Sequence, residues 1–239
     1  MEPDNSLTVP TDGTPSLVTG NLASSDEGAL VYSNGSSVYL TEAGSARQLK
    51  LQEDGSVHRA CWVSVGGSQA LVAAAQNSVQ IWDKGGSLLY LCWALPPPPP
   101  TFGGAYYACS VAAVSPTESV YVGSSAGDLF VFSSAGEMFS YKTTVSAHDS
   151  RITALAANDS AAPSVLVSGD GGGEIKVWDA FTMTVTAQIP GGGFGVTALV
   201  LCEGFVIAGY ETGAPPQPPP PRPRSTAAGS RLRGLACIV

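Results

Sequence analysis

The chain has 239 residues, of which 44% are hydrophobic and 13% are charged, and its formal net charge is −8. This composition is apolar enough for a folded core and too poor in charge for a disordered chain. The acidic balance disfavours nonspecific nucleic-acid binding, which depends on Lys and Arg, and no apolar run reaches the ~20 residues of a membrane-spanning helix. We therefore expect a globular protein that binds no nucleic acid and inserts into no membrane.

The N-terminal residues 1–15 have neither a basic start nor an apolar run, so they differ from a signal peptide and are interpreted as an extension of the fold. The five Cys residues are odd in number, widely spaced and free of any CxxC pair. Such cysteines are typical of a reduced, intracellular protein. We expect a cytoplasmic location and neither a metal site nor a cofactor.

A β-hairpin pattern recurs along the chain, in which an apolar strand, a turn of small residues and a second apolar strand follow one another. The copies cover residues 29–41, 70–83, 119–133 and 165–179, and their first residues lie 41, 49 and 46 positions apart. A fifth copy begins at Phe205 as FVIAGYETG and loses its second strand. Self-similarity at about 40–45 residues, with Trp-Asp closing some hairpins, is typical of β-propeller blades.

Shorter apolar strands complete this pattern. One precedes each later hairpin, at residues 58–65, 110–115, 151–158 and 196–201, and outer strands follow as SLLYLCWAL, EMFSYKT and TVTAQI. A β-sandwich also has short strands at regular spacing. The recurring strand order favours the propeller. We predict an all-β fold in which residues 16–213 form an incomplete propeller of about four blades plus half a blade, with the four hairpins in successive sheets about a common axis.

Two proline runs interrupt the strand pattern. Residues 96–100 are interpreted as a stiff surface insertion between blades. The second run, residues 215–223, begins where the fifth hairpin should enter its second strand, and proline cannot donate the ladder hydrogen bonds of that strand. Residues 214–239 are predicted to be a disordered, Pro- and Arg-rich tail whose deletion leaves the body unchanged. Its PPQPPPPRPR matches neither usual order of PxxP and flanking Arg in an SH3 ligand.

This tail has three explanations. It is an alternative ending, a read-through of unspliced message, or a true disordered tail, and its reversed charge bias favours the first two.

The fourth hairpin and the residues before it carry the most complete motif, with AH at 147–148, then RITALA, VLVSGDGGG and EIKVWD. In these segments the chain resembles the WD-repeat family. The resemblance implies that His148, Ser168, Asp170 and Trp178 bond one another inside the blade. It also implies that Trp82-Asp83 and Trp178-Asp179 close the second and fourth hairpins.

Two patterns imitate a catalytic site. Ser168, His148 and Asp170 have the composition of a nucleophilic triad, but Ser168 lies in an apolar strand rather than on an exposed turn. GSSAG at residues 123–127 matches G-x-S-x-G, yet a strand rather than a helix follows it. We therefore assign no catalytic residue and expect the chain not to be an enzyme.

Residues 56–213 resemble one member of the WD-repeat family most closely. The resemblance implies a noncatalytic, cytoplasmic scaffold that binds proteins or peptides through blade loops and the channel mouth. Two alternatives stay open. The chain could be a truncated fragment or isoform without independent function, and its open blade edges could then support oligomers. It could also be a propeller hydrolase, which needs acids and His at the channel, where His58 is the one histidine left besides His148.

Overall fold

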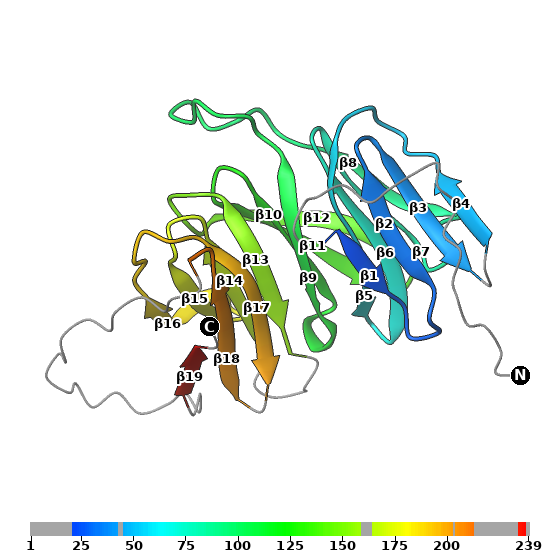
Figure 1. The fold of residues 1–239 in the computed structure, drawn as a ribbon. Helices are drawn as coiled ribbons and strands as arrows, with labels where there is room; N and C mark the ends of the chain where they lie inside the picture. The colour runs from blue at the N-terminus through cyan, green and yellow to red at the C-terminus, as the bar shows by residue number, and fades with distance from the viewer. Residues whose placement is uncertain (1–20, 43–44, 159–163, 203, 213–233, 238–239) are drawn as a thin grey trace, which may run out of the picture.

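The computed structural model describes residues 21–42, 45–158, 164–202, 204–212 and 234–237 (Figure 1). In these residues the secondary structure consists of strands β1 to β19 and one short 3-10 turn, η1 (Ser115–Thr117), which confirms the predicted all-β class. None of the described residues belongs to a helix long and apolar enough to cross a membrane.

The strands form five sheets, and in the first four the strands are antiparallel and neighbour one another in chain order. The first sheet contains β1 (Leu22–Ser24), β2 (Leu30–Asn34), β3 (Ser37–Glu42) and β4 (Ser45–Leu49). The second contains β5 (Val57–Val65), β6 (Ser68–Ala75), β7 (Ser78–Asp83) and β8 (Leu89–Ala94). The third contains β9 (Ala108–Val114), β10 (Ser119–Ser124), β11 (Asp128–Ala135) and β12 (Met138–Ser146). The fourth contains β13 (Ile152–Ala157), β14 (Val165–Asp170), β15 (Ile175–Asp179) and β16 (Thr184–Ile189). The fifth contains β17 (Val196–Cys202), β18 (Phe205–Tyr210) and β19 (Gly234–Cys237).

Successive sheets lie side by side, and the first strand of each contacts the first strand of the next, in the order β1, β5, β9, β13, β17 (Figure 1). The four predicted hairpins are confirmed as β2–β3, β6–β7, β10–β11 and β14–β15, each in a separate sheet. The hairpins therefore form neither one continuous sheet nor a pair of facing sheets. This is the arrangement of propeller blades around an axis lined by first strands.

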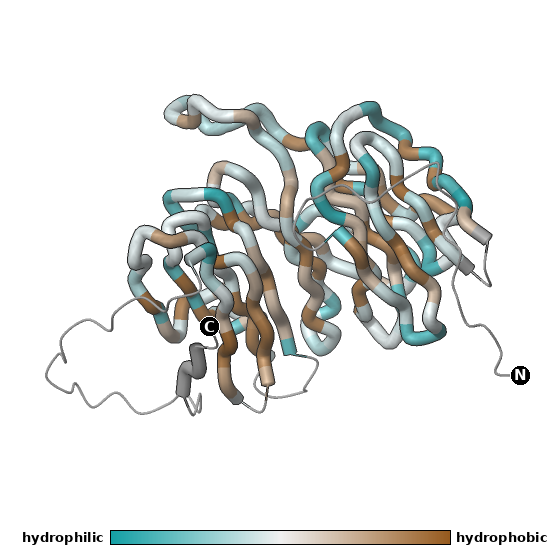
Figure 2. The backbone as a smooth tube through the Cα atoms, in the orientation of Figure 1, coloured by the Kyte–Doolittle hydropathy of each residue, from teal (hydrophilic) through white to brown (hydrophobic). Residues whose placement is uncertain are grey.

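The core lies between neighbouring sheets rather than in one central cluster. Between the second and third sheets, Val72 and Ile81 from one side meet Val122, Phe130 and Phe132 from the other. Because a middle strand is buried on both faces, it is apolar almost without interruption, as in LVAAA and FVF. Figure 2 shows the hydrophobic residues running along the strands and the hydrophilic ones gathering in the turns.

Two elements of the first sheet were not predicted. The strands β1 and β4 complete a four-stranded sheet around the first hairpin. The sequence of β1 is only LAS and that of β4 is SARQL, so neither has an apolar alternation long enough to mark a strand.

The predicted disorder of residues 214–239 is wrong for the four residues of β19. This strand pairs parallel to β18, with Phe205 opposite Gly234 and Ala208 opposite Cys237. The physical reason is the free edge of β18, whose backbone N–H and C=O groups offer a template to any extended segment. The remainder of the predicted tail lies outside the described residues, as does the N-terminal extension 1–15.

Candidate functional site

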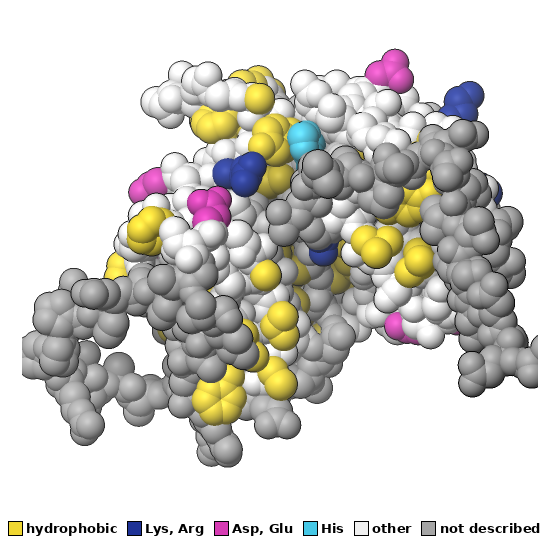
Figure 3. All heavy atoms as spheres, viewed as in Figure 1, with side chains coloured by type: hydrophobic (Ala, Val, Ile, Leu, Met, Phe, Trp, Pro, Cys, Tyr) yellow, Lys and Arg dark blue, Asp and Glu magenta, His cyan; other side chains and the backbone are white. Residues whose placement is uncertain are grey.

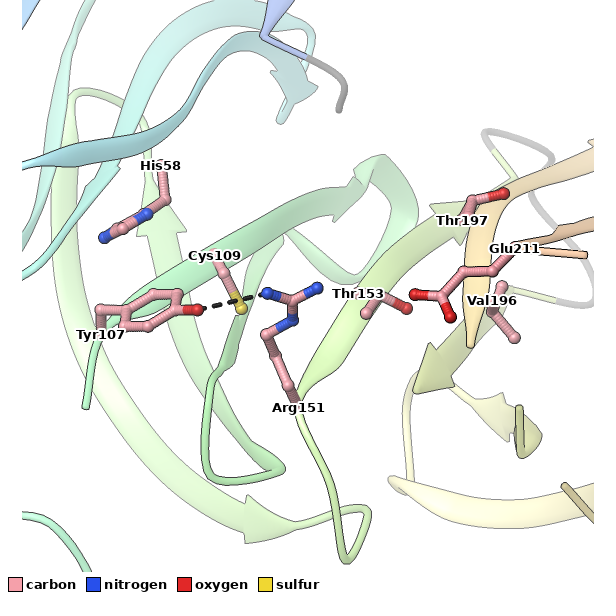
Figure 4. Close-up of a pocket in the computed structure, with 8 residues that line it drawn as sticks. All are labelled: His58, Tyr107, Cys109, Arg151, Thr153, Val196, Thr197 and Glu211. Carbon is pink, nitrogen blue, oxygen red and sulfur yellow. Dashed lines mark hydrogen bonds between the residues drawn. The ribbon is translucent and has the colours of Figure 1, made fainter. Parts of the chain in front are cut away.

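The candidate site is a cavity of about 280 Å³ at one end of the first strands, where side chains from four sheets converge. Figure 3 shows a histidine, a basic and an acidic side chain close together on the face toward the viewer. The close-up in Figure 4 identifies the lining residues as His58, Tyr107, Cys109, Arg151, Thr153, Val196, Thr197 and Glu211. We call this cavity the channel mouth.

An aromatic pair and a guanidinium form one wall of the channel mouth. The rings of His58 and Tyr107 stack with their centroids 3.9 Å apart and an angle of 23° between the planes. Arg151 Nη1 donates a hydrogen bond of 3.3 Å to Tyr107 Oη (Figure 4). That bond raises the pKa of Arg151, and the charge of Glu211 acts in the same direction. Burial and the nearby Arg151 lower the pKa of His58, so His58 is neutral at pH 7.

Cys109 is the one thiol in the channel mouth, and it is not activated. Its Sγ lies 3.1 Å from the carbonyl oxygen of Ile152 and 3.4 Å from that of Gly123, as a thiol donor would. Burial raises the pKa of Cys109 to about 12, although Arg151 opposes this shift. A protonated thiol is a poor nucleophile, so the channel mouth offers polar and aromatic contacts rather than a Cys–His dyad.

The residues of the WD-like motif lie elsewhere, in the fourth sheet and in the segment that leads into it. Ser168 and Trp178 occupy paired strands, and Trp178 Nε1 donates to Ser168 Oγ at 2.8 Å. Ser168 Oγ is also 2.7 Å from His148 Nε2, and His148 Nδ1 is 2.9 Å from Glu174 Oε2. A neutral His148 with its proton on Nδ1 satisfies every one of these contacts. Thus Trp178, Ser168, His148 and Glu174 form one continuous chain of hydrogen bonds.

Asp170 stands beside this chain rather than within it. Its Oδ2 is 3.6 Å from His148 Nδ1, which is beyond hydrogen-bond distance, and it instead accepts a 2.8 Å bond from Ser150 Oγ. Its Oδ1 accepts the backbone N–H groups of Gly172 and Glu174, which shapes the turn between β14 and β15. The resemblance to WD repeats implied Asp170 as a partner of His148, whereas the bonded partner is Glu174.

His148, Asp170 and Glu174 also place three metal-ligating atoms within 4.8 Å of one another. Each of these side chains already has hydrogen-bond or ion-pair partners within the protein. Lys176 Nζ is 3.1 Å from Glu174 Oε2, so a cation already balances this carboxylate. We assign the three side chains to hydrogen bonding within the blade.

The two Trp-Asp pairs use their Asp in the same way but differ in the hydrogen bonding of their Trp. Asp179 Oδ1 accepts the N–H groups of Phe181 and Thr182, and Asp83 Oδ1 accepts those of Ser87 and Leu88, so each Asp caps the turn into an outer strand. The buried indole N–H of Trp82, in contrast to that of Trp178, has no hydrogen-bond partner in the described part of the chain.

Neither of the catalytic patterns forms an accessible site. Ser168 is 0% exposed, so no substrate can reach its hydroxyl. GSSAG spans the tight turn between β10 and β11, where the hydroxyl of Ser124 accepts the N–H groups of Ala126 and Asp128. Both serines of GSSAG, Ser124 and Ser125, are buried.

Stability should depend on pH through His148. Burial lowers its pKa below the ordinary value, against the opposing effect of Asp170 and Glu174 and with a contribution from Lys176. The unfolded chain therefore binds a proton more readily, and stability falls as the pH drops through about 6.5, the unfolded pKa of histidine. We expect urea unfolding at pH 7.5 and 5.5 to show this loss, and His148→Gln to reduce the difference between the two pH values.

The matched control for this measurement is His58→Gln, because His58 is exposed to solvent in part and lies in the channel mouth. It should reduce the pH dependence less than His148→Gln does. An equal pH dependence in the wild type and in His148→Gln would contradict this account of His148.

No protein-family model matches this chain, and no curated protein matches it. Solved structures do match. One of them, described as "Crystal Structure of Mitotic Checkpoint Complex", contains a chain that is 17% identical, with a TM-score of 0.66 over 87% of this chain. This chain spans 65% of the length of that one. At this identity the similarity shows the fold alone, and with the sheet arrangement it supports a WD-repeat-like β-propeller fold.

Proposed function

We propose that the chain is a noncatalytic WD-repeat scaffold whose channel mouth binds a peptide segment of a partner protein. The observation that carries this proposal is the convergence on one cavity of His58, Tyr107, Arg151 and Glu211, which lie in or next to strands of four separate sheets. Their chemistry suits a peptide. Stacked rings offer apolar and cation-binding faces, the guanidinium donates to carboxylate or carbonyl oxygens, and the Glu carboxylate accepts N–H groups.

The donors of Arg151 are only partly used. Among the described residues its guanidinium forms one hydrogen bond, to Tyr107, although the group carries five N–H donors. Tyr107 and Glu211 lie on either side of it in Figure 4. An acidic side chain or a C-terminal carboxylate of a peptide therefore fits this position, because Arg binds planar carboxylates through two parallel hydrogen bonds.

The finer assignments are part of this proposal. We propose that residues 56–213 resemble WD repeat-containing protein 54, on segments such as IPGGGFGVTALVLCEGFVIAGYETG. That similarity supports a cytoplasmic scaffold and a propeller of about four blades plus half a blade in this chain. A truncated fragment or isoform with no independent function remains the alternative, and a propeller hydrolase is the less favoured one.

The test compares proteins that copurify with the tagged chain from cells, quantified by mass spectrometry. We expect Arg151→Ala to reduce recovery of a specific partner by about tenfold or more, because a charged hydrogen bond contributes roughly 1.5–3 kcal/mol. Lys142→Ala is the matched control. It also removes one positive charge, but from the exposed outer strand β12.

Size-exclusion chromatography of the same preparations separates the alternatives. A folded monomer with an Arg151-dependent partner supports the scaffold. An aggregated or edge-paired species without any specific partner supports the fragment. Equal partner recovery from Arg151→Ala and Lys142→Ala would overturn binding at the channel mouth.

A further inference from the structure

The connection between β8 and β9 is a long loop, residues 95–107, that carries five consecutive prolines. It projects from the body above the sheets in Figure 1, and Figure 3 shows it as a separate lobe with hydrophobic side chains on its surface. Four of the prolines, Pro96, Pro97, Pro98 and Pro100, are exposed, whereas Pro99 is only partly exposed. No strand pairing involves residues 95–107.

The backbone of this loop is held in one conformation by its own sequence. Each proline fixes φ near −65°, and each residue that precedes a proline is restricted to the extended region. Residues 95–99 all precede a proline, so their sequence favours a polyproline II helix with three residues per turn. The segment ends at a turn, where the N–H of Phe102 donates to the carbonyl oxygen of Pro99 at 2.8 Å. Little conformational entropy is therefore left to lose when this segment binds a partner.

Both ends of the loop are attached to the body. On the β8 side, the N–H of Leu95 donates to Asn77 O at 2.9 Å. On the β9 side, Tyr106 Oη donates to Asp128 Oδ2 at 3.2 Å, and the N–H of Tyr107 donates to Ser125 Oγ at 3.0 Å. The prolines are thus presented from fixed supports, and four of the five are exposed.

The charge pattern around the prolines restricts the kind of partner. Residues 85–141 contain no Lys or Arg, and the prolines are preceded by Leu95 and followed by Thr101 and Phe102. The proline ligands of SH3 domains carry a flanking Arg, which this loop lacks. An uncharged proline run that follows a Leu instead suits a domain that binds prolines in an aromatic-lined groove without a basic anchor, and among such domains we choose the EVH1 class for the test.

We propose that residues 95–99 form a polyproline II ligand for an EVH1-type domain of a partner protein. In this proposal the loop is the ligand of a partner domain, whereas in the proposed function the channel mouth binds a peptide of a partner. The two kinds of binding can be tested separately, because the loop variants below leave Arg151 and its neighbours unchanged.

The test titrates the full chain with an isolated EVH1 domain by isothermal titration calorimetry, with an SH3 domain as the comparison. We expect saturable binding of the EVH1 domain and at least about tenfold weaker binding by the double variant Pro97→Ala, Pro98→Ala, because the alanines loosen the helix and remove the exposed rings. The matched control is Pro219→Ala, Pro220→Ala in the second proline run, which should bind like the wild type.

Thermal melting checks that the variants stay folded, and the variant Pro97→Ala, Pro98→Ala should melt like the wild type because both residues lie outside the strands. If the loop variant melts at a lower temperature, a peptide of residues 94–103 provides the second measurement and should compete with the full chain. The proposal is overturned if the EVH1 domain does not bind, if only the Pro219/Pro220 variant loses binding, or if the SH3 domain binds the loop more tightly.

Discussion

Replacing Trp178 by Ala is expected to lower the free energy of unfolding by about 3–5 kcal/mol, the range for truncating a large buried aromatic residue. Trp178 is 4% exposed and packs with Leu129, Ile152 and Leu166 between the third and fourth sheets. The Ala variant leaves a cavity in that layer and removes the N–H donor of Ser168. Urea denaturation followed by circular dichroism measures the loss.

A pair of Phe variants separates the cavity from the hydrogen bond. Trp178→Phe and Trp82→Phe both remove a buried indole ring, but only Trp178 has a hydrogen-bond partner for its N–H among the described residues. We expect Trp178→Phe to destabilise the fold by about 1–3 kcal/mol more than Trp82→Phe, the cost of breaking a satisfied buried bond.

The difference between the two tryptophans follows from strand register. Trp178 is paired with Leu166, and Ser168 follows two residues later on the same face. Trp82 is paired with Leu71, and the equivalent position is Ala73, which has no side-chain acceptor.

If Trp178→Ala melted like the wild type but lost a partner protein, Trp178 would be a binding residue rather than a core residue.

The repeating hairpins were predictable because their apolar middle strands carry a local signal. The same repeat also contains a regular spacing that would have predicted residues of the channel mouth. His58, Tyr107, Arg151 and Val196 stand at the beginning of successive first strands, 49, 44 and 45 residues apart. Equivalent positions in a propeller meet at one end of the channel, so this spacing could have identified most of the cavity in advance.

Other features left no such signal. Glu174 reaches His148 because the turn after Asp170 folds back toward the residues before β13, which depends on backbone hydrogen bonds from Gly172 and Glu174. The pairing of β19 with β18 joins segments that are far apart in the sequence and share no repeat. Contacts of this kind depend on tertiary geometry, which periodicity does not encode.

The second large effect is expected at Gly127, the last residue of GSSAG. Its φ is +89°, a region that L-residues rarely adopt, and an added Cβ would collide with the backbone carbonyl of His148. The carbonyl oxygen of Gly127 accepts the N–H groups of both Ala147 and His148, each at 3.0 Å. Gly127 therefore holds the chain that carries His148 against the turn of the third sheet. We expect Gly127→Ala to destabilise the fold by at least about 3 kcal/mol, since backbone strain and a lost contact act together.

Gly136 provides the matched control, because its φ is +66° but an added Cβ would meet nothing within 4 Å. Gly136→Ala should lose only about 1–2 kcal/mol, from the left-handed backbone conformation alone. Urea denaturation of the two variants gives the comparison, and an equal loss in both would show that the approach of Gly127 to His148 is not rigid. The larger loss expected at Gly127 would explain the glycine of G-x-S-x-G by close packing between blades.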